Sequence, residues 1–481
     1  QKGRKMEQIN ILSQSSAILL TLGLSIIFVM LGVFYSKKYK GLNNYLVANR
    51  SIGTFSLTSS LVASALGAWI LFGPASAATW GGIGAVFGYA LGTAFPLFIL
   101  IYLGPKFRKL YPKARTLIEV IRLRFGQKLF KLILFLSIFY MTIFLIAEVT
   151  AVSILINYIS GVDLWITALI VIASSLIYTL YGGLRASIFT DNIQFVVFGL
   201  LLLIGFTYLI SFNSNEFNFK FKNFKKPNLL NPNYLPNFTA GLTFFIAVAA
   251  TNLFHQGNWQ RVYAAQDNRV LKKSLIISFI IIVPVVFMMG FSGLIAVSQN
   301  SNVVPDLAFF YLLFKEQTLA LYIIVIVLAI SLTISSIDTL INAISSLIVV
   351  DGNRIIKFRG DYLKLSKQII ILISLITFFV ASKGLGILYL FLLADLFCCA
   401  AVLTIFYSFY NRSLNEKNAY RSITIGLIMG LLLFPSPGFS ESILIGIIFP
   451  IHIFPTFVSQ SLLFTSFFVA TFLPIVTWKI K

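Results

Sequence analysis

Charged residues are scarce in this chain: they make up only 11% of its 481 residues, whereas 58% are hydrophobic. A soluble protein of this length needs far more polar surface to stay dispersed. The mean hydropathy is +0.92, and apolar runs of about 20 residues, the length that crosses a hydrocarbon core, recur along the sequence. The composition excludes an ordinary soluble domain and predicts an all-α, polytopic protein embedded in a lipid bilayer.

Reactive and metal-binding side chains are also few, with two cysteines and two histidines in the chain. Cys398 and Cys399 are adjacent within an apolar run, so they neither bridge readily nor match a metal-ligand spacing. We expect them to be packing residues. The sequence has no HExxH motif and no nucleophile arrangement, so it gives no support for an enzyme.

Acidic residues are outnumbered by basic ones, 15 against 37, and the net charge is +22. The basic residues lie in short segments between apolar runs, where they orient spans in the membrane, so we expect no nucleic-acid partner. The segment 105–131 is the most basic and predicts a cytoplasmic loop. Counting spans from it places the N-terminus outside, in a cell membrane that we expect to be the bacterial inner membrane. Four other basic segments then share the cytoplasmic side: 37–50, 261–273, 351–367 and 411–421.

The apolar runs predict about thirteen spans. They are expected at 11–36, 55–79, 82–104, 132–158, 164–181, 190–212, 238–258, 274–298, 318–348, 367–382, 385–410 and 421–436, with one or two more between 441 and 479.

One early span is interrupted. In SLVASALGAWILFGPASAATWGG, Gly67, Gly73 and Pro74 break an otherwise helical run. An unwound helix is tolerated in a membrane only where its freed carbonyl groups are buried or line a cavity. Such oxygens suit a hard monovalent cation. A proline-kinked packing helix with small residues at its contacts explains the same pattern equally well.

A second interruption is predicted in ATNLFHQGNWQR, where Asn252, His255, Gln256 and Asn258 crowd around Gly257. Polar side chains at membrane depth are costly and usually face a cavity or another helix, which is the interpretation that we favour. In the alternative, the cluster caps a helix at the interface and the tryptophan that follows belongs to the aromatic belt.

The run LAISLTISSIDTLINAISS carries polar side chains at three- and four-residue spacings, which place them on one helix face. Hydroxyl groups in membrane helices often only bond the carbonyl group four residues back, but this stripe also contains Asp338 and Asn342. Two more acids, Glu148 and Asp395, lie in other apolar runs. The roles of Glu148, Asp338 and Asp395 stay open.

The stretch GGLRASIFTDNIQ, residues 182–194, lies between two predicted spans. Gly182 and Gly183 make the turn, Arg185 is an inside-positive residue, and Asp191 begins the next span. Together with the preceding SSLIYTLYGG, the pair Ser335–Ser336 and the WQR after the polar cluster, this stretch resembles the signature of the sodium:solute symporter family.

The resemblance implies a LeuT-like fold whose core consists of two inverted five-helix repeats, at 55–212 and 238–410. An extra transmembrane helix at 11–36 would precede this core, and further helices at 421–479 would follow it. Both interruptions then fall in the first helix of a repeat, where ion and substrate sites lie near the midplane.

Residue by residue, the resemblance also implies the sites. Asp191 would lie on the cytoplasmic exit route and attract the released sodium ion. The sodium ligands would be the backbone carbonyl groups or hydroxyl groups of Ala63, Leu66, Leu332, Ser335 and Ser336. The solute would bind between the two broken helices, near Trp69, Ile70, Asn252, His255 and Gln256.

The implied function is secondary active transport: inward sodium movement drives uptake of a small polar solute by alternating access. The segments 107–126 and 257–265 look closest to the urea and polyamine branch, with the proline branch next. Ala65 stands where the proline branch has an aspartate, and this helix has no acid for a cationic polyamine. A neutral or zwitterionic solute such as urea or proline is therefore our first expectation. The alternative is a transporter-like sensor subunit that binds the solute without accumulating it.

Overall fold

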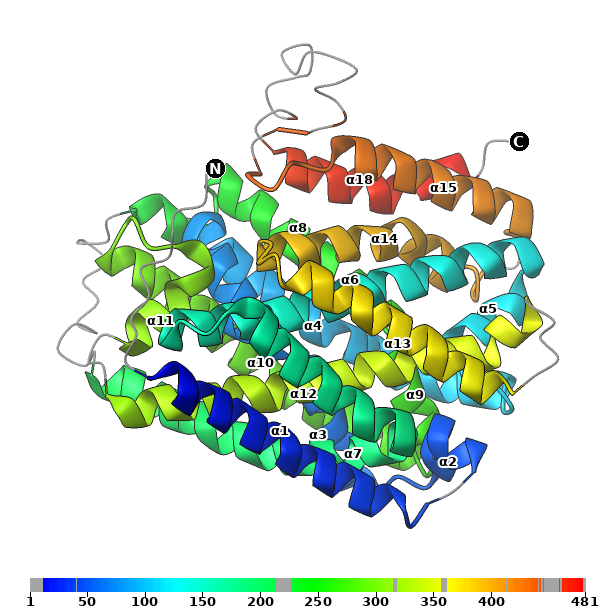
Figure 1. The fold of residues 1–481 in the computed structure, drawn as a ribbon. Helices are drawn as coiled ribbons and strands as arrows, with labels where there is room; N and C mark the ends of the chain where they lie inside the picture. Colours follow the sequence, from blue (N-terminus) through cyan, green and yellow to red (C-terminus); the bar gives the residue numbers. More distant parts are fainter. Residues whose placement is uncertain are drawn as a thin grey trace.

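The computed structural model describes residues 12–39, 41–212, 226–314, 318–355, 361–411, 413–439, 441–442, 444, 458 and 461–478, without the side chains of 208–212 and 362. Over this part the chain is a bundle of long helices, and its only β pairings are two isolated bridges. Most helices run along a common direction, with α2, α5 and α9 at one end of the bundle and α11 at the other (Figure 1). The all-α prediction is confirmed.

Nine helices of the described part are long and apolar enough to cross a membrane. They are α1 (Gln14–Ser36), α4 (Gly73–Leu110), α6 (Gln127–Ser160), α7 (Leu164–Phe212), α8 (Leu235–Phe254), α10 (Asn268–Gln299), α12 (Leu319–Val350), α13 (Tyr362–Ala381) and α14 (Ile387–Tyr407).

Shorter elements connect these helices or flank them. The α-helices among them are α2 (Leu42–Val47), α3 (Thr54–Ala65), α5 (Leu117–Arg124), α9 (Gln256–Ala264), α11 (Ala308–Leu313), α15 (Glu416–Leu433) and α18 (Leu462–Thr477). The 3-10 turns are η1 (Ala48–Arg50), η2 (Ala68–Leu71), η4 (Pro227–Leu230), η5 (Pro305–Leu307) and η7 (Gly352–Arg354). Of the region predicted to add one or two spans between 441 and 479, residues 445–457 lie outside the described residues.

Single glycines divide α4 and α7. Gly82 has φ 59° and ψ −153°, and Gly183 has φ 61° and ψ −154°, so each turns the chain between two helical halves. Because one left-handed glycine makes the turn, no loop residues are needed. The second half of α7 starts directly after Gly183, so Asp191 lies two turns inside its helix and not at the helix start.

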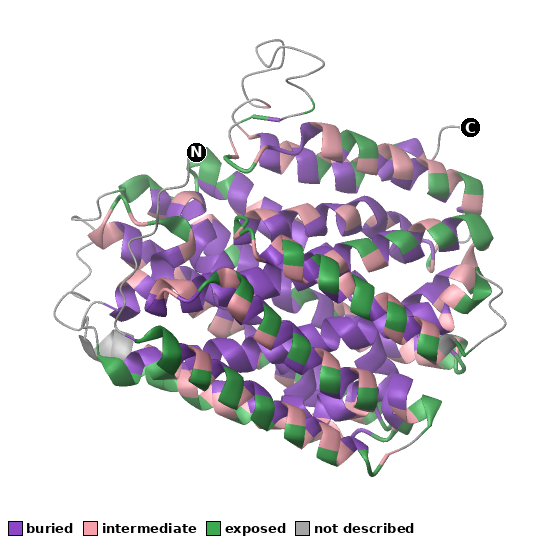
Figure 2. Cartoon of the chain, viewed as in Figure 1, coloured by how far each residue is buried: buried purple, intermediate pink, exposed green. Residues whose placement is uncertain are grey.

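Burial divides the bundle into a core and a periphery (Figure 2). In its most apolar stretch α12 is 78% buried, whereas the corresponding stretches of α1 and α13 are 28% and 22% buried. On α1, large apolar side chains such as Phe34 are exposed, as expected for helices that face lipid tails. Helix α12, which carries the stripe of polar side chains, therefore lies in the middle of the protein.

Close helix contacts rest on small residues. Along α4, Gly84, Gly88 and Gly92 recur every four residues, and a Cβ atom at any of them would press on the backbone of α8. The atoms met at Gly84 and Gly88 are backbone atoms of Asn237 and Gly241. Small residues at this spacing let two membrane helices approach closely, which fixes α4 against α8 beside the second interruption.

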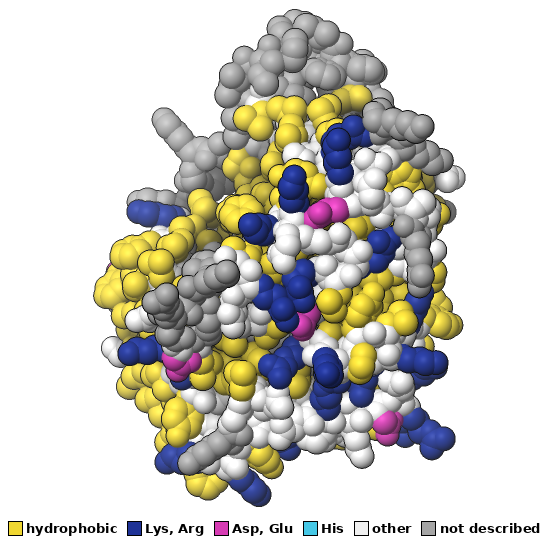
Figure 3. All heavy atoms as spheres, turned by 90° about the vertical axis from the view of Figure 1, so that its right-hand side faces the viewer, with side chains coloured by type: hydrophobic (Ala, Val, Ile, Leu, Met, Phe, Trp, Pro, Cys, Tyr) yellow, Lys and Arg dark blue, Asp and Glu magenta, His cyan; other side chains and the backbone are white. Residues whose placement is uncertain are grey.

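Basic side chains gather at the end of the bundle that carries α2 and α5, where acidic ones are few (Figure 3). At this end Arg50 donates a hydrogen bond of 2.9 Å to the carbonyl oxygen of Ala114, and Arg354 forms an ion pair of 2.9 Å with Glu119. Through Arg50 and Arg354, the described parts of the segments 37–50 and 351–367 therefore share one side with 105–131, as predicted.

Replacing Gly183 with alanine tests the turn in α7. Its left-handed φ costs a residue with a Cβ atom about 1–2 kcal/mol, and this Cβ would also overlap the ring of Tyr45. We expect Gly183→Ala to lower the melting temperature of the detergent-solubilised protein. Gly199→Ala, in the same helix, is the matched control, because no heavy atom lies within 4 Å of its Cβ position. Equal melting temperatures for the two variants would show that the turn does not require glycine.

Candidate functional site: two broken helices, a cavity and a buried ion pair

The first interruption lies between α3 and α4. The last backbone hydrogen bond of α3 joins the Leu66 nitrogen to the Val62 oxygen at 2.9 Å. The chain then leaves the helix at Leu66 (φ −104°, ψ 74°), passes through η2 and enters α4 with Pro74 in its first turn. Carbonyl groups at the end of α3, such as that of Ala63, therefore lack the amide partners that a continuous helix supplies. The span is opened, rather than merely kinked.

Glu148 of α6 fills this break. The amide nitrogen of Ala68 donates a 2.9 Å hydrogen bond to its Oε2 atom. A Cβ atom at Gly67 would overlap both Oε1 of Glu148 and Oγ of Ser336. Only glycine therefore allows a carboxylate oxygen and a hydroxyl oxygen to lie so close to the opened chain. The Ser336 hydroxyl is buried and has no hydrogen-bond partner among the described residues.

The second interruption is a break at His255, between α8 and α9. Side chains of α9 cap the carbonyl groups that it frees: Nδ2 of Asn258 donates to the Asn252 oxygen and Nε1 of Trp259 donates to the Leu253 oxygen, both at 2.8 Å. Trp259 has no exposed surface. Its alternative role as a belt residue was therefore wrong, and this stretch lies inside the protein.

A cavity lies between the two interruptions. Its walls come from α3, η2, α4, α6, α8, α12 and α14, and from His255. The residues that line it are Ser64, Ala65, Trp69, Tyr89, Phe144, Glu148, Val248, Asn252, His255, Ser336, Thr339, Leu340, Phe391 and Asp395.

Three of the five predicted solute contacts, Trp69, Asn252 and His255, line this cavity. Ile70 and Gln256 do not. Ile70 is fully buried among apolar residues. Gln256 points to the basic end of the bundle, where its Oε1 accepts a 3.0 Å hydrogen bond from the amide nitrogen of Leu117.

Most of the cavity wall was not predicted from the sequence. The sequence identified Glu148 and Asp395 as acids within apolar runs but did not indicate that they line the same cavity. Tyr89, Phe144 and Phe391 gave none, because aromatic residues are abundant throughout the chain and only the packing of α4, α6 and α14 brings these three to one place.

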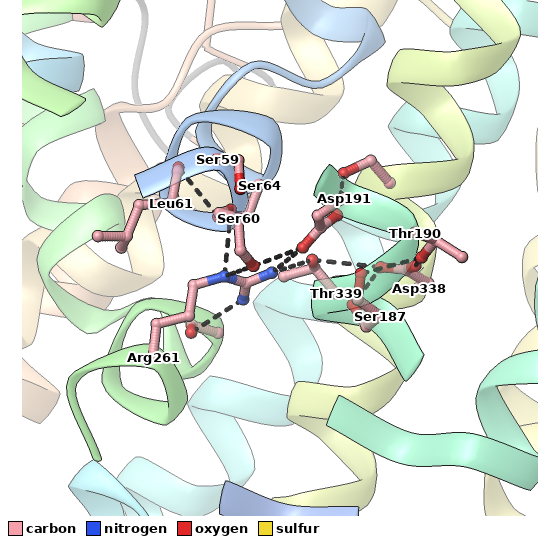
Figure 4. A network of polar contacts seen from close by, with 12 residues as sticks. Ser59, Ser60, Leu61, Ser64, Ser187, Thr190, Asp191, Arg261, Asp338 and Thr339 are labelled. Carbon is pink, nitrogen blue, oxygen red and sulfur yellow. Dashed lines mark hydrogen bonds and ion pairs between the residues drawn. The ribbon is translucent and has the colours of Figure 1, made fainter. Parts of the chain in front are cut away.

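A network centred on Arg261 of α9 lies beside the cavity (Figure 4). Its Nη2 atom is 2.9 Å from Oδ2 of Asp191, and both side chains have no exposed surface. The same Nη2 donates to the Thr339 hydroxyl at 2.9 Å, and Nε donates to the Ser60 hydroxyl at 2.7 Å. The network joins α9 to α7, α12 and α3.

Asp191 accepts two more hydrogen bonds, from the hydroxyl groups of Ser60 (2.5 Å) and Ser335 (2.6 Å). The resemblance had implied a carboxylate that attracts the departing sodium ion. In this structure the charge of Asp191 is already balanced by Arg261 and shielded from solvent. Any role in sodium exit requires this pair to separate first.

Asp338 is satisfied by hydroxyl groups of α7. Tyr178 donates to its Oδ2 at 2.5 Å and Ser187 donates to its Oδ1 at 2.8 Å. These two residues lie on opposite sides of the turn at Gly183. Asp338 therefore links both halves of α7 to α12.

One further acid lies near the first interruption but outside the membrane-spanning helices. Asp306 of η5 accepts a 2.8 Å hydrogen bond from the hydroxyl group of Ser76, near the start of α4. Burial raises the pKa of the Asp306 carboxyl group, and the hydrogen bond from Ser76 opposes that rise. This contact fastens η5 over the end of the opened helix.

The predicted sodium ligands lie on two neighbouring elements. Ser335 and Ser336 are on α12, with Leu332 one turn earlier, and Ser336 faces the opened chain directly after Leu66. Neutral oxygens from hydroxyl and backbone carbonyl groups form a donor set that suits a hard cation. The unpartnered hydroxyl of Ser336 is a buried acceptor that a sodium ion would satisfy.

Removing one partner of the buried ion pair tests its structural role. Asp191→Asn leaves the Arg261 guanidinium buried without a counter-charge, which typically costs about 3–5 kcal/mol. We expect a large fall in the melting temperature of the purified protein. The matched control is Glu119→Gln, which removes the carboxylate of the partly exposed pair with Arg354, worth about 0–1 kcal/mol. Similar decreases in melting temperature for both variants would show that the buried ion pair contributes no more to stability than the partly exposed one.

Comparisons with known proteins agree with this geometry. Residues 45–426 match the model of the sodium:solute symporter family. A spermidine transporter, DUR31, from Candida albicans is 26% identical over 78% of this chain and 71% of that protein. Sodium/glucose cotransporter 1 from Mus musculus is 30% identical over 39% of the chain, and a probable urea active transporter from Schizosaccharomyces pombe is 28% identical over 41%. These two matches span only 28% and 30% of the relatives' own lengths.

Two solved structures share the fold. A Na⁺-coupled sialic acid symporter in a substrate-bound, outward-open state is 17% identical, with a TM-score of 0.71, over 96% of this chain and 98% of that one. MHP1, a nucleobase-cation-symport-1 family transporter, is 14% identical, with a TM-score of 0.58, over 90% and 93%. The LeuT-like fold is thereby confirmed, and the chain belongs to the sodium:solute symporter family.

Proposed function

We propose that this protein uses an inward sodium gradient to accumulate a small polar solute, which binds in the cavity between the two broken helices. The observation that carries this proposal is the unpartnered hydroxyl of Ser336, buried against the opened chain beside Gly67. A buried polar atom without a partner is costly, and a cation bound between α3 and α12 would remove that cost. Urea and proline remain candidate solutes at this stage.

The proposed sodium site joins two parts of the protein that move relative to each other in alternating access. Carbonyl groups of Ala63 and Leu66 would come from the broken helix, and Leu332, Ser335 and Ser336 would contribute from α12. Sodium can shift the conformational balance only by binding one state more tightly. Because its ligands are divided between α3 and α12, the ion would favour the state in which these elements are close together.

The Arg261 network would control the opening of the cavity towards the basic end of the bundle. It binds α9 to α3 and α7 at the edge of the cavity, and neither Arg261 nor Asp191 reaches solvent. Opening towards the basic end of the bundle would separate these elements. Asp191 would then be free to attract the sodium ion on its way out, as the resemblance implies.

The domain and membrane assignments complete the proposal. Residues 55–212 and 238–410 would act as two inverted repeats that rock around the cavity, with α1 and the C-terminal helices outside this core. The basic end of the bundle would face the cytoplasm and the N-terminus the outside, in a cell membrane that we assign to the bacterial inner membrane.

Ser336→Ala tests the sodium site. The loss of one ligand oxygen should raise the half-saturating sodium concentration for solute-dependent stabilisation and uptake by about tenfold, equivalent to about 1.4 kcal/mol. Sodium titrations of the melting temperature and of uptake into proteoliposomes would measure it. Ser374→Ala is the matched control, because the hydroxyl group of Ser374 is also buried without a partner among the described residues, but lies on the peripheral helix α13. An unchanged sodium dependence in Ser336→Ala would refute the site, and saturable binding without sodium-driven accumulation in the wild type would favour the sensor alternative.

A further inference from the structure

The cavity is lined by two carboxyl groups whose charge, when they are ionised, no side chain of its wall balances. Two carboxylates line it, Glu148 from α6 and Asp395 from α14, and no lysine or arginine does. Both side chains are only 3% exposed. The ion pairs formed among the described residues leave both of them out. A buried carboxylate is normally paired with a cation or held by several hydrogen bonds, so the cavity as it stands favours a positively charged occupant.

The nearest cationic groups are already committed. The three guanidinium nitrogens of Arg261 donate to Ser60, to the Gly257 carbonyl oxygen and to Asp191. Nδ1 of His255 accepts a 3.1 Å hydrogen bond from the amide nitrogen of Gly257, and an accepting ring nitrogen carries no proton. The imidazole at the cavity wall is therefore neutral, and neither group balances the two carboxylates.

The two carboxylates differ in what surrounds them. Glu148 accepts an amide hydrogen bond from Ala68 and lies against Ser336, at the proposed sodium site. Its charge would be offset by backbone dipoles and by the sodium ion. The Asp395 carboxyl group accepts a side-chain hydrogen bond from Thr251, whose oxygen also lies 3.1 Å from the carbonyl oxygen of Ala247, and Asp395 takes part in no ion pair among the described residues. Asp395 is therefore the carboxylate that the protein itself leaves without adequate compensation.

Aromatic rings line the cavity together with Asp395. Trp69 stacks against Tyr89 at 5.8 Å between ring centroids and meets Phe391 edge-on at 6.5 Å. Phe144 contacts Phe391 at 5.2 Å. Ring faces attract ammonium groups, most strongly where water is excluded. A carboxylate beside several rings forms a site for an organic ammonium ion, whereas it gives no comparable advantage to a neutral amide.

We propose that the transported solute is an organic cation whose ammonium group binds at Asp395 among these rings, while sodium lies at the Glu148 side of the same cavity. This inference rests on the proposed function and replaces the expectation of a neutral solute. That expectation considered only the broken early helix, which has no acid, whereas Glu148 and Asp395 come from α6 and α14.

Matched pairs of small molecules test the charge preference. Ethanolamine and 4-aminobutan-1-ol would be compared with ethylene glycol and butane-1,4-diol, which have similar sizes but no charge. In saturating sodium, we expect the two amines to raise the melting temperature of the full-length protein with apparent affinities at least tenfold higher than those of the two diols. A preference for the diols, for urea or for proline, or no shift with either amine, would overturn the inference.

Asp395→Asn tests the residue itself. It should weaken the amine-dependent shift at least tenfold and leave the sodium-dependent shift in place, and Asp395→Glu should partly restore amine binding. Asp361→Asn is the matched carboxylate-to-amide control, because Asp361 caps α13 far from the cavity and asparagine caps a helix equally well. Full amine binding by Asp395→Asn would overturn the inference. The absence of any sodium effect on the wild type would instead contradict the proposed function, whatever the charge of the solute.

Discussion

The structure depends on one constraint: a backbone opened inside a membrane must find partners for its freed polar groups. At the second interruption the protein supplies these partners itself, through Asn258 and Trp259. At the first, Glu148 satisfies the amide group of Ala68 and Trp69 donates to the Ala65 carbonyl group, but the hydroxyl group of Ser336 has no partner among the described residues. The incomplete satisfaction of this break is what makes it suitable for a cation.

The same constraint explains why the surrounding polar residues form separate networks. Arg261 and Asp191 balance each other, and Asp338 is satisfied by hydroxyl groups of α7. The side chains of Arg261, Asp191 and Asp338 form contacts between helices, and these contacts determine how α7, α9 and α12 pack. Glu148 and Asp395 are different, because they line a cavity and have hydrogen-bond partners, Ala68 and Thr251, but no ion pair among the described residues. The division separates residues that hold the fold from residues that remain available to an ion or a solute.

Those features of the fold and the site that depend on neighbouring residues in the chain could be predicted from the sequence. The interruption at Gly67 and Pro74 and the polar cluster around Gly257 can each be recognised within a few consecutive residues. Both interruptions were therefore located from the sequence. Boundaries were less certain: one left-handed glycine at Gly183 replaces a loop, which moved Asp191 into the body of a helix. Gln256 was assigned to the solute because it is next to His255, yet the break between α8 and α9 turns it towards α5.

The sequence by itself determined the membrane environment, the helical class, the positions of the two interruptions and the family resemblance, because hydropathy and short motifs are properties of neighbouring residues. Only the tertiary structure decided which buried charges are balanced. Arg261 lies 70 residues from Asp191, and Glu148 and Asp395 meet the same cavity from different helices. Electrostatic energy depends on distance in space and on exclusion of water, and neither can be obtained from the order of residues in the chain.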